Sequence, residues 1–307
     1  MPRIAFVFPG QGAQYPGMGK ELSLNFEEAA DVFSQADNIA GYSMRSLCFD
    51  DSAGQLSLTE FSQPALLVSS LAAFEAALAS GLKPTMMAGL SLGEYSALVA
   101  SGSLDLTVAL PLVQVRGQLM QNAVPPNRGS MAAVLGADPA LVEKTCQEVD
   151  GVVSIANYNC PGQVVVSGER EAVEEVTRHL KDQGVRVIPL AVSVPSHSPL
   201  MFDAAMQLKL KLAEVSFKEG DTPVVSNVNA HENQAADLID LLTRQLYQPV
   251  RWEESIRYMM QNVDYFVEIG PGSTLSGLIK KIDRNKILGN IEDMRSLDKT
   301  LKKVNAL

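Results

Sequence analysis

Short runs of apolar residues alternate along the chain with longer segments in which apolar side chains recur every three or four positions. The short runs are typical of buried β-strands, and the longer periodic segments are typical of amphipathic helices. This alternation predicts an α/β protein. We expect strands over residues 1–8, 85–88, 224–226 and 265–269, and helices over residues 94–100, 105–120, 201–215, 237–247 and 252–262.

The segment from about residue 130 to 190 differs from the rest because its elements follow the order β-α-β-β-α-β. Apolar runs predict strands over 131–135, 152–158, 164–167 and 185–190, and the helices lie over 139–148 and 171–183. This order is that of the ferredoxin-like split motif. A stretch rich in proline and glycine, 125–129, precedes it, so we expect an inserted small subdomain of residues 129–190 within a large domain of residues 1–128 and 191–307.

A serine lies at the turn between the strand predicted over 85–88 and the helix predicted over 94–100. Ser91 is the centre of a G-x-S-x-G pentapeptide at residues 89–93. In such an elbow a strained turn exposes the hydroxyl, the glycines avoid steric clash, and the N–H after the serine points to where an oxyanion forms. The same pentapeptide occurs by chance in many loops, but the flanking strand and helix favour a catalytic nucleophile.

A serine nucleophile needs a base, and the chain has three histidines. His179 lies in a charge-rich helical segment and His231 in a polar loop, and both settings are typical of a solvated surface. His197 follows an apolar strand where the chain re-enters the large domain, which makes it the candidate base. The acids between Ser91 and His197 fall at the Asp105 helix start or in the small subdomain. We therefore expect a Ser-His dyad without a carboxylate; a buried histidine satisfied by the backbone is the alternative.

One cation lies on an apolar face of the helix predicted over 105–120. Arg116 follows the spacing of four apolar side chains: Ala109, Leu112, Val113 and Met120. A buried guanidinium is costly without an anion, so either an internal acid or a ligand carboxylate is implied. A planar guanidinium suits a carboxylate bidentately, but spacing leaves the structural ion pair equally open. Pro111, inside the same helix, predicts a kink.

Two glycine-containing turns follow predicted strands. Residues 8–14 lack both the G-K-[ST] of a phosphate loop and the spacing of a dinucleotide fingerprint. Their glycines would let the backbone approach a neighbouring site, to which Gln11 could be delivered. The turn at 270–275 opens a helix, either as a plain connection or as a helix N-terminus beside a cofactor phosphate.

Composition excludes several classes of function. With 307 residues and a net charge of −10, the chain lacks the dominant basic surface of a nucleic-acid-binding protein. Its most apolar stretch, 65–82, is interrupted by polar residues, and its first apolar run is too short for a signal peptide, so we expect a cytoplasmic protein without a membrane span. Three separated cysteines without a C-x-x-C pattern predict neither disulfides nor a metal site.

Six short motifs occur together in this chain: FPGQG at 8–12, GLSLGEY at 89–95, QVRG at 114–117, VSVPSH at 192–197, RQLY at 244–247 and GPG at 270–272. In this order and at these separations they closely resemble the malonyl-CoA:acyl-carrier-protein transacylases of fatty-acid synthesis, from residue 4 to about 282. The resemblance implies a large α/β-hydrolase-like domain with a ferredoxin-like subdomain. Many relatives have a histidine where this chain has Leu90, a position to which no chemistry is assigned.

The resemblance also implies roles for individual residues. Ser91 is the nucleophile that carries the malonyl ester, and His197 is its general base and later the general acid. The main-chain carbonyl of Gln245 orients the imidazole, which agrees with the missing acid. Gln11 and the backbone N–H of Leu92 form the oxyanion hole.

Substrates and partners follow from the same resemblance. Arg116 holds the malonyl carboxylate, and the small Ser196 shapes the acyl pocket. The substrates are malonyl-CoA and the phosphopantetheine thiol of an acyl carrier protein, and we expect a monomer without cofactor or metal. A basic run is either the carrier-docking patch or a solvated helix face: Lys280, Lys281, Arg284 and Lys286.

Three other functions stay open at this stage. A discrete acyltransferase that serves a polyketide synthase in trans has the same chemistry. A serine esterase or thioesterase would release free malonate, because water would have to attack in place of a thiol. A non-catalytic carrier-binding subunit would not depend on Ser91.

Overall fold

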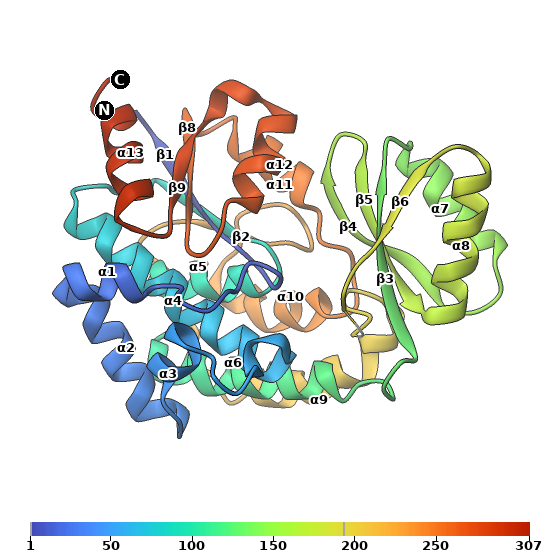
Figure 1. Ribbon diagram of the computed structural model, residues 1–307, viewed down its shortest axis with the longest axis horizontal. Coiled ribbons are helices and arrows are strands. Elements are labelled where there is room, and N and C mark those ends of the chain that lie inside the picture. The colour runs from blue at the N-terminus through green and yellow to red at the C-terminus, as the bar shows by residue number, and fades with distance from the viewer. Residues whose placement is uncertain (1, 193) are drawn as a thin grey trace.

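The computed structural model describes residues 2–192 and 194–307, which form two β-sheets side by side with helices packed around them (Figure 1). Residue 193, within the motif at 192–197, lies outside the described residues. One sheet is parallel and the other antiparallel. The α/β fold class with a large hydrolase-like part and a ferredoxin-like part is confirmed. The domain boundaries at 128/129 and 190/191 stay a prediction.

The larger sheet has the strand order β7-β2-β1-β8-β9, and neighbouring strands are parallel. Its strands are β1 Ile4–Phe8, β2 Met86–Gly89, β7 Val224–Val225, β8 Tyr265–Ile269 and β9 Ile287–Ile291. Phe8 pairs with Gly89, so the last residues of β1 and β2 lie next to each other. The loop that contains Gln11 and the elbow that contains Ser91 therefore leave the same edge of the sheet.

Helices cover both faces of this sheet, which explains why β1 and β2 are unbroken apolar runs. Alternate residues of β1 face opposite sides: Phe6 packs with Phe74 of α4 in one cluster, whereas Val7 packs with Trp252 and Ile256 of α11 in another. The helices of this part are α1 Lys20–Asn25, α2 Glu27–Ala40, α3 Met44–Phe49, α4 Thr59–Ala79, α5 Leu92–Ala100, α6 Leu106–Gln121, α9 Phe202–Leu212, α10 Leu238–Gln245, α11 Trp252–Met259, α12 Thr274–Ile282 and α13 Met294–Val304.

Helix α4 is long and apolar enough to cross a membrane by length and composition alone, but 83% of its most apolar window is buried inside the protein. It contacts α2, α5 and α6, and it is the central helix of the large apolar cluster. Its apolar character on all sides is that of a core helix.

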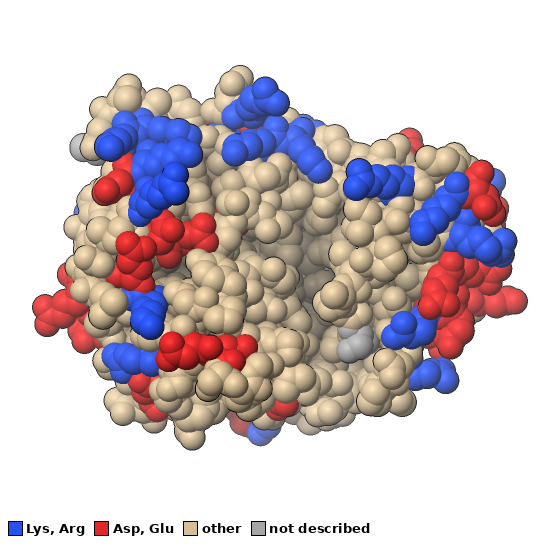
Figure 2. Space-filling view, in the orientation of Figure 1, with Lys and Arg blue, Asp and Glu red and all other residues tan. Residues whose placement is uncertain are grey.

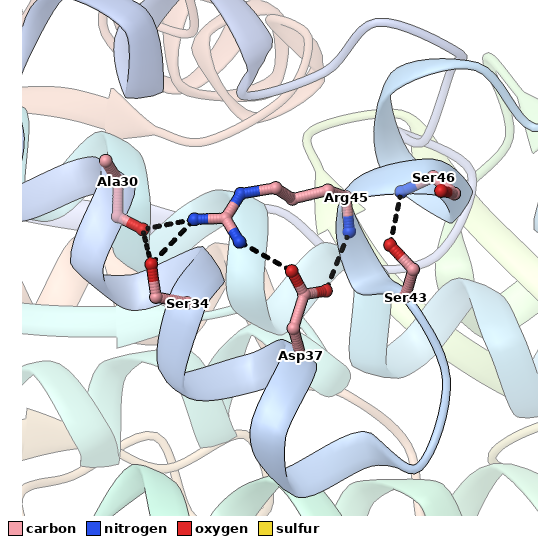
Figure 3. A network of polar contacts seen from close by, with 6 residues as sticks. All are labelled: Ala30, Ser34, Asp37, Ser43, Arg45 and Ser46. Carbon is pink, nitrogen blue, oxygen red and sulfur yellow. Dashed lines mark hydrogen bonds and ion pairs between the residues drawn. The ribbon is translucent and has the colours of Figure 1, made fainter.

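Polar side chains connect the N-terminal helices to one another (Figure 3). Arg45, on α3, donates to Asp37 at 2.6 Å and to Ser34 at 2.6 Å, both on α2. Ser43 caps α3 by accepting from the N–H of Ser46. The contacts of Arg45 hold α3 against α2.

The smaller sheet is antiparallel with the order β4-β5-β3-β6. Its elements are β3 Gly129–Leu135, α7 Pro139–Glu148, β4 Val153–Cys160, β5 Gln163–Glu169, α8 Arg170–Asp182 and β6 Arg186–Pro189. Both helices pack on one face (Figure 1). Main-chain hydrogen bonds from Tyr158 to Val250 and from Val250 to Ala156 join β4 to the large part.

Most predicted elements are confirmed within a few residues, and three details differ from the expectation. α6 continues through Pro111 as one helix. Asp105 is its N-cap residue but makes no side-chain cap bond, because its carboxylate pairs with Lys218 at 3.0 Å. β6 ends at Pro189, and only the N–H of Leu190 still bonds to β3 before the chain crosses to the large part.

Candidate active site

The elbow between β2 and α5 has the strained backbone that the pentapeptide predicts. Ser91 has φ 54° and ψ −107°, an uncommon conformation for a residue with a side chain. A Cβ on Gly89 would lie 1.8 Å from the carbonyl carbon of Gly93, and one on Gly93 would lie 2.1 Å from the Phe8 oxygen. Both glycines are therefore needed for β2, the turn and α5 to pack against β1.

Asn227 holds this turn from the neighbouring strand end, and sequence reasoning missed it. Its side chain accepts from the Ser91 N–H at 2.6 Å and donates to the Gly89 carbonyl at 2.7 Å. It is fully buried just after β7. The one signal that could have found Asn227 is its place at the carboxyl end of a parallel strand, where functional side chains of open α/β sheets gather.

His197 lies beside the serine. Its Nε2 is 2.9 Å from Ser91 Oγ, and its Nδ1 is 2.6 Å from the main-chain oxygen of Gln245. A carbonyl only accepts, so Nδ1 carries the proton and Nε2 is free to accept the Ser91 hydroxyl. Burial is the main cause that lowers the pKa of His197 to about 4, and the positive charge of Arg116 is the second. The hydrogen bond to the Gln245 carbonyl raises this pKa and so partly opposes them. The imidazole is therefore neutral at physiological pH.

Arg116 completes the cluster and is fully buried. Its Nη1 donates to Gln63 Oε1 at 2.5 Å, and its Nη2 donates to Ser91 Oγ at 3.2 Å and to Gln245 Oε1 at 3.0 Å. Its guanidinium also lies 5.4 Å from the centre of the Tyr95 ring. Within residues 2–192 and 194–307, no carboxylate oxygen lies within 4.0 Å of Arg116, so the internal ion pair is not formed directly.

A second buried ionisable group, Glu94, lies near Arg116. Glu94, on α5, is 1% exposed and accepts from the Gln245 side-chain amide at 2.6 Å and from the Asn227 N–H at 3.1 Å. Burial raises the pKa of Glu94 to about 7, and the hydrogen bonds from Asn227, Gln245 and Ser226 and the charge of Arg116 oppose that rise. Neither the charge of Glu94 nor the side chain of Gln245 was identified from the sequence.

A pocket of about 340 Å³ opens at the serine, between the large part and the small sheet, where Figure 2 shows the surface hollowed. Residues from both sheets line it, including Ser91, Leu90, Ser196 and His197 from the large part and Met131, Asn157 and Val165 from the small sheet. The exposed face of the small sheet is thus one wall of the site.

Of the remaining candidate residues, two lie in the pocket and two histidines lie outside it. Gln11 and Leu92 also line the pocket; Gln11 Nε2 donates to Thr59 Oγ1 at 3.1 Å, and Leu92 opens α5, where main-chain N–H groups have no helical partner. His179 lies on α8 and His231 is exposed, where its ring contacts Tyr258, so neither reaches the site.

The described residues contain no group of three or more His, Cys, Asp or Glu side chains that could hold a metal ion. The cysteines are all buried, and burial raises the pKa of Cys48 and of Cys146 to about 12, so these thiols stay protonated.

The chain matches the acyl transferase domain family over residues 5–301. It is 44% identical to the malonyl CoA-acyl carrier protein transacylase of Bacillus subtilis, over 99% of each chain. The solved structure of malonyl CoA-acyl carrier protein transacylase from Clostridium perfringens gives a TM-score of 0.96 at 42% identity, with 99% of this chain and 98% of that chain covered. A structure of a type II polyketide synthase acyl-carrier protein in complex with its malonyl-transacylase gives a TM-score of 0.94 at 42% identity, with 98% and 99% covered.

Proposed function

The chain belongs to the acyl transferase domain family, and from that premise we propose that it transfers a malonyl group from malonyl-CoA to the phosphopantetheine thiol of an acyl carrier protein. The transfer passes through an ester on Ser91 and supplies fatty-acid elongation. The observation that carries this function is the contact of one hydroxyl, Ser91 Oγ, with both a neutral imidazole and a buried guanidinium.

In the first half-reaction, His197 Nε2 takes the proton of Ser91 Oγ as the oxygen attacks the thioester carbonyl. Gln11 and the backbone N–H of Leu92 form the oxyanion hole, which stabilises the tetrahedral anion. When the carbon–sulfur bond breaks, His197 returns the proton to the departing coenzyme A thiol. The Gln245 carbonyl holds the Nδ1–H throughout, so it stabilises the imidazolium that forms in between.

In the second half-reaction the carrier's thiol enters the same pocket. His197 takes the thiol proton, the sulfur attacks the ester carbonyl, and the proton passes to Ser91 Oγ as the oxygen leaves. The enzyme returns to its starting state with one thioester exchanged for another. No step needs a cofactor.

Arg116 gives the site its preference for a carboxylated acyl group. Arg116 is buried next to Ser91, and no carboxylate of the described residues contacts it directly. A malonyl carboxylate bound there would pair with the guanidinium. A site built to bind a polar group discriminates against an acyl group that lacks it far better than an apolar pocket does. Ser196, small and in the pocket wall, leaves room for that group.

Intact-mass analysis after incubation with malonyl-CoA in the absence of carrier tests this function. We expect one stable malonyl group per chain, which is lost in Ser91→Ala and kept in the control Ser96→Ala, a buried serine of α5. Rapid release of free malonate would instead favour a thioesterase. Unchanged growth of cells that carry Ser91→Ala would favour a non-catalytic subunit.

The carrier docks, we propose, on the basic run at the rim of the pocket. Lys280 and Lys281 lie in the last turn of α12, and Lys281 Nζ contacts Gln163 of the pocket wall at 2.7 Å. Blue side chains gather over α12 in Figure 2. Arg284 and Lys286 follow in the next turn. Charge reversal of Lys280 and Lys281 should raise the KM for carrier, unlike reversal of Lys302 on α13; an unchanged KM would remove this patch.

A polyketide carrier is the second candidate acceptor, because one similar structure contains such a carrier with its malonyl-transacylase. Comparison of kcat/KM for a fatty-acid carrier and a polyketide carrier decides between them. We propose a cytoplasmic monomer, which cell fractionation and light scattering test.

A further inference from the structure

One fully buried side chain, that of Gln245, lies between the two buried charges of the site. Its Nε2 donates to Glu94 Oε2 at 2.6 Å and to the Ser91 carbonyl at 3.0 Å. Its Oε1 accepts from Arg116 Nη2 at 3.0 Å. The main-chain oxygen of the same residue accepts from His197, so the role of the side chain can be separated from that of the main chain.

The surroundings leave this amide a single orientation. An ionised Glu94 and the Ser91 carbonyl only accept hydrogen bonds, and Arg116 only donates them. The amide nitrogen must therefore face Glu94 and Ser91, and the amide oxygen must face Arg116. The side chain acts as a neutral spacer: Glu94 offsets the charge of Arg116 without touching the guanidinium.

We propose that Gln245, through this side chain, is a specificity-determining positioning residue, which keeps the buried carboxylate of Glu94 off Arg116 so that the guanidinium stays available to the substrate carboxylate. This inference rests on the proposed function, because it assumes that Arg116 binds an acyl carboxylate. A glutamate at position 245 would form a direct ion pair with Arg116, and the substrate would then have to break a buried ion pair to bind.

The charges around Glu94 agree with this assignment. The pKa of Arg116 is lowered by burial, and Tyr95 and Glu94 only partly restore it. Glu94 meets Arg116 of α6, Tyr95 of its own helix, Ser226 and Asn227 after β7, and Gln245 of α10. Asn227, Gln245 and Ser226 donate to the carboxylate, and the charge of Arg116 balances it. Of these three donors, Gln245 is the one whose side chain contacts both the guanidinium and the elbow.

A position swap tests the proposal, because Glu94→Gln with Gln245→Glu keeps the net charge and the side-chain sizes but moves the carboxylate into contact with Arg116. The measurement is the rate at which malonyl-CoA and acetyl-CoA acylate Ser91 in a single turnover, followed by intact mass. Damage to the elbow slows both substrates alike and cancels in the ratio of the two rates. The swap should lower the malonyl-to-acetyl ratio by at least about a hundredfold, two steps of about 1.4 kcal/mol.

Gln245→Met removes the spacer without adding an anion, so we expect a smaller fall in the ratio, about tenfold, for one lost hydrogen bond to a charged group. Gln114→Glu is the matched control: this α6 side chain donates to the Ala40 carbonyl away from the site, and its variant should keep the wild-type ratio.

The inference would be overturned if the malonyl-to-acetyl rate ratio of the swap variant stayed within threefold of wild type, which includes the case in which both acylation rates fall equally. If the swap does not fold, Gln245→Met decides, since a purely structural side chain would slow both substrates equally. Failure of wild-type protein to form a malonyl ester would instead refute the proposed function itself.

Discussion

Removal of the Asn227 side chain should damage the elbow more than any other single truncation outside the reacting groups. In Asn227→Ala, the Ser91 N–H and the Gly89 carbonyl both lose their partner in a region that water does not reach. The main-chain bond from residue 227 to Glu94 is retained, because it does not involve the side chain. The variant therefore isolates the two bonds that hold the strained serine.

The size of the effect follows from those two bonds. An unpaired buried polar group costs about 1–3 kcal/mol, so the two together cost about 2–6 kcal/mol. At about 2.1 cal/mol/K per residue, a chain of 307 residues unfolds with an entropy of about 0.6 kcal/mol/K. Tm should thus fall by about 3–10 °C. A shift of Ser91 Oγ by about 1 Å should also slow acylation by about a hundredfold.

Thermal unfolding and single-turnover acylation by malonyl-CoA measure the two effects. Asn229→Ala is the control, since among the described residues the side chain of this partly buried neighbour bonds only to the loop residues Asn233 and His231. It should change Tm by no more than about 2 °C and leave acylation unaffected. If Asn227→Ala had the same Tm as Asn229→Ala and an acylation rate within twofold of wild type, the elbow would not depend on the Asn227 side chain.

Three further predictions address other parts of the site. Arg116→Ala should lower the malonyl-to-acetyl ratio of kcat/KM by about 10² to 10⁴, the worth of two hydrogen bonds to a charged group, and a preserved ratio would refute its role. Inactivation by a serine-directed sulfonyl fluoride should keep its rate from pH 8 down to about pH 5, because the lowered pKa of His197, about 4, leaves the imidazole neutral there; a midpoint near 6.5 would contradict this. Gly93→Ala should lower Tm sharply or prevent folding, because its Cβ would lie 2.1 Å from the Phe8 oxygen, whereas Gly277→Ala on α12 meets no atom within 4 Å and should be tolerated. Equal Tm values for these two variants would show that the elbow can absorb the methyl group.

The fold could be predicted where the chain has strong local periodicity. The βαββαβ order of the small sheet and the strands at 4–8, 86–89 and 265–269 were found because a buried parallel strand and an amphipathic helix have different apolar spacing. Five elements were not predicted, since they are short or strongly polar on their outer side: α1, α2, α3, β9 and α13. Their positions depend on packing against α4 and β8.

The site was predicted in part. Ser91, His197 and Arg116 meet within hydrogen-bond distance, as the motifs imply. The spacing left two partners open for Arg116, an internal acid or a ligand carboxylate. The structure contains the internal acid, Glu94, but the side-chain amide of Gln245 separates it from the guanidinium. Gln63 and the side chain of Gln245 carry no signal in a single sequence, because glutamine is an ordinary residue in a helix. For Asn227 the one signal is its place just after a predicted strand.

The sequence by itself determined the elbow, because the constraint there is local: two glycines and a serine between an apolar strand and a helix leave one way to pack the turn. Tertiary structure decided which groups surround that serine. Asn227 and Gln245 reach it across separations of 136 and 154 residues, and His197 across 106. Such contacts depend on strand order and helix packing, which bring the ends of β2, β7 and α10 to one point, and spacing along the chain does not encode them.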